Sequence, residues 1–141
     1  MKKTFRKLLE DGGTEVIRLS TNNGLTGYRI VDFKAMPNIP GNADAEFIFK
    51  VFANEPDAAV NTVNFDDPQL LATAYFTDRS GSGPVELVVV SDHVQINQDI
   101  FVTLVTNGSS QSCNYQIELE QIKLDKNEAT VATLKDMRGR E

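Results

Sequence analysis

The residue types used in nucleophilic catalysis occur together at one place, where Ser91, Asp92 and His93 follow one another. His93 is the only histidine among the 141 residues, so any histidine-dependent mechanism must use it. The members of a catalytic triad converge from separated parts of a chain, whereas consecutive side chains of a strand or turn point in different directions. We therefore interpret the trio as a polar strand end and predict no catalytic residue here.

The single cysteine, Cys113, stands at the start of a stretch in which polar and apolar residues alternate. A reactive thiol needs a nearby base or electropositive surroundings, and the sequence assigns it neither. One cysteine excludes an internal disulfide, and one cysteine with one histidine excludes a Cys/His zinc site. We predict that Cys113 packs as a small apolar side chain, and that the protein is no enzyme and carries no cofactor.

Four acidic residues near the middle of the chain are of the type that binds calcium: Glu55, Asp57, Asp66 and Asp67. Ca²⁺ is held by several carboxylate and carbonyl oxygens, but the spacing here differs from that of an EF-hand loop. An aspartate directly before a proline is typical of a helix N-terminus. We therefore predict a short helix beginning at Pro68, and no bound metal.

The elements that must position these residues are strands, because apolar residues recur with a period of two over most of the chain. β-Branched and aromatic residues are enriched in the same stretches. At least six strands are predicted in this way, at residues 15–19, 28–35, 46–53, 85–90, 100–106 and 115–120. The stretch 85–90 is apolar on both faces, which is typical of a strand covered on both sides or at the centre of a sheet.

Turn-forming residues separate the strands. Asn22-Asn23-Gly24 and Asn107-Gly108 are hairpin signals, because Asn and Gly accept the positive φ of tight turns. Residues 37–41 predict a corner at which the chain crosses between sheets. Asp125 with Glu128 three residues later predicts a capping box and a helix running to about Met137.

The fold expected from these elements is all-β: a single-domain β-sandwich or jelly roll of about seven or eight strands with a short C-terminal helix. Residues 1–13 are predicted as a basic N-terminal arm, 14–124 as the sandwich, and 125–141 as the helix and tail. No apolar run of a signal peptide follows Lys2-Lys3, and no stretch reaches the length of a membrane span. We therefore expect synthesis in a cytoplasm.

Charge is unevenly distributed along the chain, whose formal net charge is -6. Residues 41–100 hold ten acids and two bases, a balance of -8, whereas residues 1–10 hold four bases and one acid, a balance of +3. An acidic chain has no long-range attraction to nucleic acid or to an anionic membrane. The four bases either dock on an acidic neighbour, including another copy, or belong to a solvated terminus.

A candidate contact surface lies on the strand at residues 46–53, where Ile48 and Phe52 fall on the face opposite Phe47, Phe49 and Val51. If the latter three point into the core, two apolar side chains point outward. The alternative is a strand that is covered on both faces within the subunit. The predicted subunit interface therefore consists of Lys2, Lys3, Arg6, Lys7, Ile48 and Phe52.

Much of the second half of the sequence resembles small virion proteins of marine tailed phages, particularly those of cyanobacteria. The matching stretches are residues 97–101, 114–121 and 128–138, together with 27–34 earlier in the chain. The resemblance implies a structural protein located in the virion, either a capsid decoration, cement or accessory protein or a piece of the neck or tail. It implies partners such as the major capsid protein and further copies of the chain, and it assigns no functional residue.

Two other function classes stay open at this point. A receptor-binding, lectin-like sandwich usually offers aromatic platforms on loops, but this chain has no Trp, and its three Tyr fall within predicted strands. An enzyme would need acids such as Asp66 and Asp92 to converge in a cleft. The virion structural role is the function that we expect.

Overall fold

A computed structural model describes residues 1–21, 24–40, 46–79, 83–108 and 111–138. Eight strands and one helix form over these ranges, which confirms an all-β sandwich with a C-terminal helix. The elements are β1 Lys2–Leu9, β2 Thr14–Ile17, β3 Thr26–Pro37, β4 Glu46–Phe52, β5 Leu70–Arg79, β6 Gly83–Val90, β7 Ile100–Asn107, β8 Cys113–Lys123 and α1 Lys126–Arg138.

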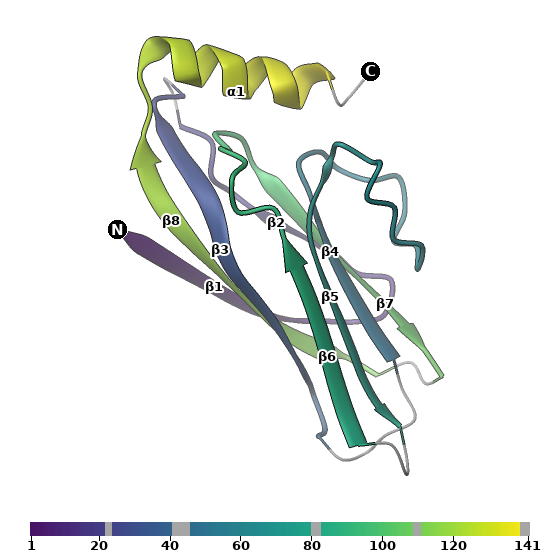
Figure 1. The fold of residues 1–141 in the computed structure, drawn as a ribbon. Helices are drawn as coiled ribbons and strands as arrows, with labels where there is room; N and C mark the ends of the chain where they lie inside the picture. The colour runs from purple at the N-terminus through teal and green to yellow at the C-terminus, as the bar shows by residue number, and fades with distance from the viewer. Residues whose placement is uncertain (22–23, 41–45, 80–82, 109–110, 139–141) are drawn as a thin grey trace.

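The strands form two antiparallel sheets that pack face to face. The three-stranded sheet has the order β1-β8-β3, and the five-stranded sheet has the order β2-β7-β4-β5-β6. The helix α1 follows β8 and lies across one end of the sandwich (Figure 1). The edge strands are β1 and β3 in the first sheet and β2 and β6 in the second.

The core lies between the sheets and is built from alternate residues of the strands. The aromatic rings of Phe33, Phe49 and Tyr115 pack edge to face, with centroids 6.0 Å apart for Phe33–Phe49 and 5.6 Å for Phe49–Tyr115. Phe49 is fully buried, as are Ile117 of β8 and Leu104 of β7. The predicted inward direction of Phe47, Phe49 and Val51 is confirmed by their burial.

A β-bulge in β3 corrects the predicted division of its side chains. Ile30 pairs with Leu119 and Asp32 with Glu118, so Val31 is an extra residue in the ladder. Because a bulge places one residue out of the alternation, Phe33 returns to the face of Ile30 and both are fully buried. A strict period of two over residues 28–35 would place Val31 and Phe33 on one face, and the bulge separates them.

The two predicted hairpins are in fact crossings between sheets. β2 and β3 belong to different sheets, and so do β7 and β8. Gly24 and Gly108 do have positive φ values, of 68° and 93°, so the turn chemistry was recognised correctly but the strands it joins do not pair. Asn22 and Asn23 lie outside the described residues. The predicted crossing between sheets after β3 is confirmed, since β3 and β4 lie in different sheets, although residue 41 of the predicted corner lies outside the described residues.

The C-terminal helix begins with the predicted capping box. Glu128 N–H donates to Asp125 Oδ1 at 2.7 Å, and Asp125 N–H donates to Glu128 Oε1 at 3.3 Å. The helix packs through Ala129 and Ala132, which are buried. The side chain of Asn97 connects the helix to the segment before β7, because its Nδ2 donates to Ala129 O at 3.2 Å.

The first residues of the chain form part of the sandwich rather than a separate basic arm. β1 pairs with β8 from Lys2, opposite Glu120, to Leu9, opposite Cys113. The alternation in this stretch escaped the sequence analysis because only Phe5 and Leu9 are apolar on the side that faces the core. Edge strands commonly carry lysine in this way, since charge discourages unwanted pairing.

Candidate functional site

The outer face of β4 does not offer the contact surface that the alternation predicted. Ile48 is only 7% exposed, because β5 and β7 flank it in the sheet. Lys50, on the same face, is 2% exposed, and its Nζ donates to Thr62 O at 2.6 Å, so the segment between β4 and β5 lies against the sheet here. The alternative of a strand covered on both faces therefore holds for Ile48, which is excluded from a subunit interface.

The buried Lys50 ammonium is the most unusual charge in the sheet. Burial lowers the pKa of Lys50, and the carboxylate of Asp67 only partly offsets this effect. The Lys50 ammonium also lies 5.4 Å from the ring centroid of Phe52, within cation–π range. Lys50 thus fixes the segment between β4 and β5, and this is a structural role.

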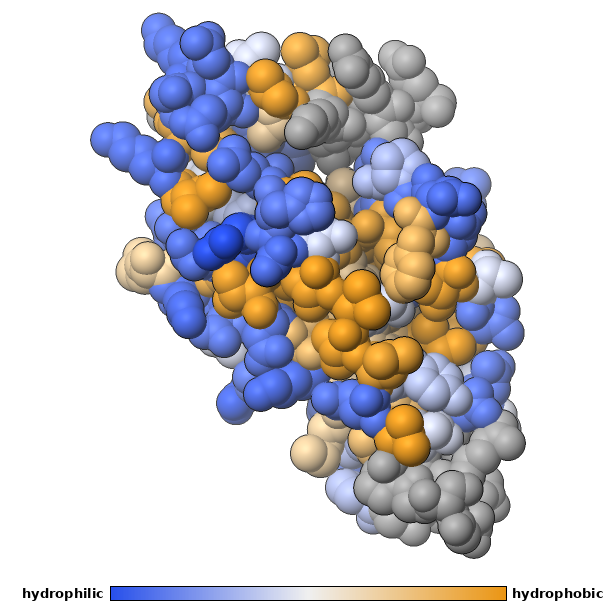
Figure 2. Space-filling view, in the orientation of Figure 1, coloured by the Kyte–Doolittle hydropathy of each residue, from blue (hydrophilic) through white to orange (hydrophobic). Residues whose placement is uncertain are grey.

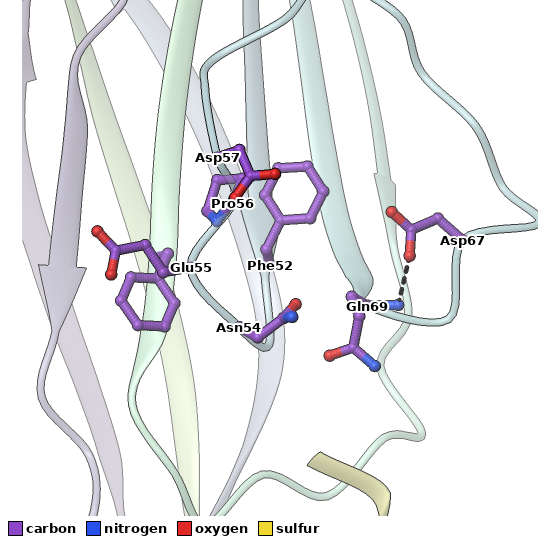
Figure 3. A pocket seen from close by; sticks show the side chains of 8 residues that line it. Phe52, Asn54, Glu55, Pro56, Asp57, Asp67 and Gln69 are labelled. Carbon is purple, nitrogen blue, oxygen red and sulfur yellow. Dashed lines mark hydrogen bonds between the residues drawn. The ribbon is translucent and has the colours of Figure 1, made fainter. Parts of the chain in front are cut away.

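Phe52, the other predicted apolar contact, is half-buried and lines an open hollow of about 640 Å³ at the end of β4. Figure 3 shows the side chains that surround it. The lining residues are Phe52, Asn54, Glu55, Pro56, Asp57, Asp67, Gln69 and Phe101. Three carboxylates beside two aromatic rings make this hollow electronegative, so it suits a cationic group better than an anion.

The acids of this hollow do not converge as metal ligands do. No group of three or more His, Cys, Asp or Glu side chains within the described ranges has the geometry to hold a metal ion. Asp67 Oδ1 instead accepts from Gln69 N at 2.9 Å, and Asn64 Oδ1 accepts from Asp66 N at 3.0 Å. These local bonds shape a turn. The helix predicted at Pro68 does not form, because the turn leads directly into β5 at Leu70.

The histidine and the cysteine occupy different surroundings and do not meet. Ser91, Asp92 and His93 lie in the turn after β6, where Asp92 and His93 are exposed. Cys113 is fully buried at the start of β8, and burial raises the pKa of its thiol to about 12. The predicted packing role of Cys113 is confirmed by this burial.

The four bases of the predicted interface are exposed along β1, with local partners. Lys2 Nζ lies 3.7 Å from Glu118 Oε1, and Lys7 Nζ lies 4.0 Å from Glu15 Oε2. Arg6 Nε donates to Gln116 Oε1 at 2.6 Å. Lys3 Nζ donates to the Tyr28 hydroxyl at 3.4 Å. These bases do not come together with Ile48 or Phe52, which belong to the other sheet.

The structure reveals a surface that the sequence analysis missed, on the outer face of β6. Val85, Leu87 and Val89 are 49%, 63% and 42% exposed. The prediction of a covered or central strand at 85–90 was wrong, because β6 is the last strand of the five-stranded sheet. Its even-numbered residues, Val88 and Val90, do pack against the core. Here the apolar residues on both faces belong to an edge strand, whose inner face packs on the core and whose outer face is exposed.

The exposed face of β6 continues onto the neighbouring strand β5. In the register of the sheet Leu87 lies opposite Tyr75, which is half-buried, and the apolar surface ends before β4, where Ile48 is buried. Figure 2 shows hydrophobic residues gathered on the side of β6 and mostly hydrophilic residues on the side of β3 and β8. We call Val85, Leu87 and Val89 the β6 row. Scattered apolar side chains on a surface are ordinary, but a contiguous row on a strand that ends a sheet is a candidate contact surface.

Comparison with known proteins adds no assignment: no protein-family model matches the sequence, and neither does any curated protein. Among the described residues, no helix is long and apolar enough to cross a membrane; α1 has 13 residues. The β6 row is therefore the candidate functional site on the strength of its geometry.

Proposed function

We propose that this protein is a non-catalytic structural subunit of a tailed-phage particle, a capsid decoration, cement or accessory protein that acts through contacts between subunits. The proposal rests on the resemblance of residues 97–101, 114–121 and 128–138 to small phage virion proteins. The observation that supports it is the β6 row, an apolar surface on an edge strand. An exposed apolar surface of this kind suits a protein that acts by binding to neighbouring subunits, which remove the surface from water.

The physical logic of a particle subunit suits a small contact surface. Repetition around a symmetric shell multiplies a weak contact, so no single interface must be strong. The opposite sheet offers a complementary property, because its outer face carries paired charges that stay in water. One molecule thus presents one face for contact and one for solvent.

Mass spectrometry of purified particles of the encoding phage tests the proposal. We expect the protein in mature particles at a fixed copy number relative to the major capsid protein. Immunogold electron microscopy then locates it: labelling over the head supports a decoration or accessory role, whereas labelling at the neck or tail favours the alternative position. Absence from mature particles overturns the proposal, and saturable binding on a glycan array would replace it by a receptor-binding module.

A further inference from the structure

We infer that two copies of this chain associate through β6, which pairs with its symmetry mate in antiparallel fashion about a two-fold axis near Leu87. The pairing joins the two five-stranded sheets into one continuous sheet and places the two β6 rows side by side. The inference rests on the proposed function for its biological setting, since it names the partner of the proposed contact surface. It concerns the protein in solution, so either idea can fail without the other.

The backbone of β6 is able to accept a further strand. β6 pairs with β5 on one side and ends the sheet on the other. The backbone hydrogen bonds that join other elements of the described chain include none from residues 85–90. An edge strand with open N–H and C=O groups is completed by the addition of another strand.

The exposed side chains favour burial at this same edge. Leu87 is 63% exposed in the middle of the β6 row, with Val85 and Val89 two residues to either side. In an antiparallel pair centred on Leu87, the two Leu87 side chains meet, and each Val85 lies opposite the partner copy's Val89. The six side chains that meet, three from each copy, are all apolar, and the valines are also β-branched. Cross-strand contacts of this kind stabilise sheets.

Charge argues for a second copy as the occupant. Glu86 is the only charged residue between Val85 and Val90. Its Oε2 accepts from Ala35 N of β3 at 3.4 Å, so it is engaged within its own subunit. In the Leu87-centred register, Glu86 lies opposite Val88 rather than opposite its own copy, and no like charges are directly opposed.

The edge strand β1 of the other sheet differs from β6 in charge, and its charge opposes pairing with a second copy. β1 is also an edge strand, but it carries Lys2, Lys3, Arg6 and Lys7, all exposed. Pairing of β1 with itself would bring eight positive charges together across one interface. The two edges therefore differ in the property that decides self-association, and β6 is the edge without this repulsion.

Light scattering coupled to size-exclusion chromatography, over a range of protein concentrations, tests the association. We expect a dimer that dissociates on dilution. Leu87→Lys should weaken it by at least about tenfold, because the substitution places two ammonium groups at the two-fold axis. The matched control is Leu134→Lys on α1, where Leu134 is 47% exposed, and it should leave the dimer unchanged. A wild-type monomer at every concentration, or equal loss in both variants, overturns the inference.

Disulfide trapping tests the register independently of stability. Opposed strand residues have Cα atoms about 4.5–5.5 Å apart, within disulfide range. Leu87→Cys should therefore cross-link to itself under mild oxidation, whereas native Cys113 is buried and should not. Val85→Cys alone should give little cross-linking, but together with Val89→Cys it should cross-link efficiently.

A control position and the combined outcomes complete the design. Val63→Cys places a thiol at a residue that is 43% exposed outside β6, and it should cross-link poorly. Equal cross-linking at residues 63 and 87 overturns the inference. A dimer in solution without the protein in mature particles overturns only the proposed function, and a monomer that is present in particles overturns only this inference.

Discussion

The outer faces of the two sheets differ in polarity: the three-stranded sheet carries ion pairs, whereas the five-stranded sheet exposes apolar side chains at β6. On the three-stranded sheet, Arg29 Nη2 lies 2.7 Å from Glu120 Oε2 and Lys34 Nζ lies 3.3 Å from Asp32 Oδ2. On the five-stranded sheet, the edge strand β6 points the β6 row outward, and none of these three side chains is charged. Both sheets use the same inward alternation, so the core does not distinguish them. The difference is that one outer face exposes ion pairs to water and the other exposes apolar side chains, and it is the basis of the contact that we propose.

The largest effect is expected where both sheets depend on one residue. Phe49 lies on the five-stranded sheet, and its ring packs against Phe33 and Tyr115 of the three-stranded sheet. Phe49→Ala should lower the free energy of unfolding by about 3–5 kcal/mol, because it leaves a cavity between the sheets. Urea unfolding monitored by circular dichroism measures this. A loss below about 1 kcal/mol would contradict the description of a shared, tightly packed core.

A smaller loss is expected on the outer face of the five-stranded sheet, at Lys50. Lys50→Ala should cost about 2–3 kcal/mol, because it removes the hydrogen bond from Nζ to Thr62 O and leaves the carbonyl without this donor. The matched control is Lys34→Ala on the opposite sheet, where the side chain is exposed, and it should change stability by less than about 1 kcal/mol. Equal losses would contradict the assignment of Lys50 as buried.

The same lysine gives a pH dependence of known sign. The pKa of Lys50 is lowered in the folded protein from its ordinary value of 10.5, so the unfolded chain binds the proton more tightly. The stability of the wild type relative to Lys50→Met should therefore rise with pH between the lowered pKa and 10.5, as the cost of the buried charge disappears. Paired denaturant titrations at pH 7, 9 and 10 measure this difference. A fall with increasing pH would contradict it.

The next effect concerns Asp99, which directly precedes β7 and binds the chain that follows the edge strand β2. Its Oδ1 accepts from Leu19 N at 2.8 Å and from Ser20 N at 3.0 Å, so it fixes the chain just after β2. Burial alone would raise the pKa of Asp99, but these backbone bonds and Arg18 together outweigh burial and lower the pKa. Asp99→Ala should cost about 1–2 kcal/mol near pH 7.

The pH profile of that loss provides its control. Because the folded pKa of Asp99 lies below 3.8, the carboxylate contributes stability above that value and loses it as the pH falls through the folded pKa. Wild type and Asp99→Ala should therefore converge in stability in acid, as measured by thermal unfolding at several pH values. A constant difference down to the lowest pH would point to packing rather than charge.

The smallest effect is expected at the paired charges themselves. Arg29→Ala should lower the free energy of unfolding by less than about 1 kcal/mol, because an exposed ion pair gains little in water. The loss should shrink further in 1 M salt, and unfolding curves at two salt concentrations measure this. A large, salt-independent loss would mean that this face is more than a solvated surface.

The sequence predicted six of the eight strands in the described residues, because alternation reports burial directly, but it missed β1 and β5. Phe47, Phe49 and Val51 lie where the period of two places them, and Asp125 caps α1 as its spacing with Glu128 predicts. The errors came from features that alternation does not encode. The bulge at Val31 shifts one strand by a residue, and only the register of the partner strand reveals it.

The candidate site was harder to predict because it depends on strand order. An apolar stretch at 85–90 is equally consistent with a central strand and with an edge strand that has one bare face. Ile48 was misjudged for the same reason, since its burial comes from flanking strands and from the segment around Thr62. Which strands end a sheet is decided by contacts between distant parts of the chain, which no local pattern records.

The position of β8 has a consequence for how the protein forms on the ribosome. β8 is the central strand of its sheet, and both β1 and β3 pair with it. As the chain emerges from its N-terminus, β1 and β3 must wait, without their native partner, until residues 113–123 have been synthesised. Folds dominated by such sequence-distant pairings form in milliseconds to seconds rather than microseconds. Because charge discourages the pairing of an exposed strand with other chains, the lysines of β1 oppose aggregation during this interval.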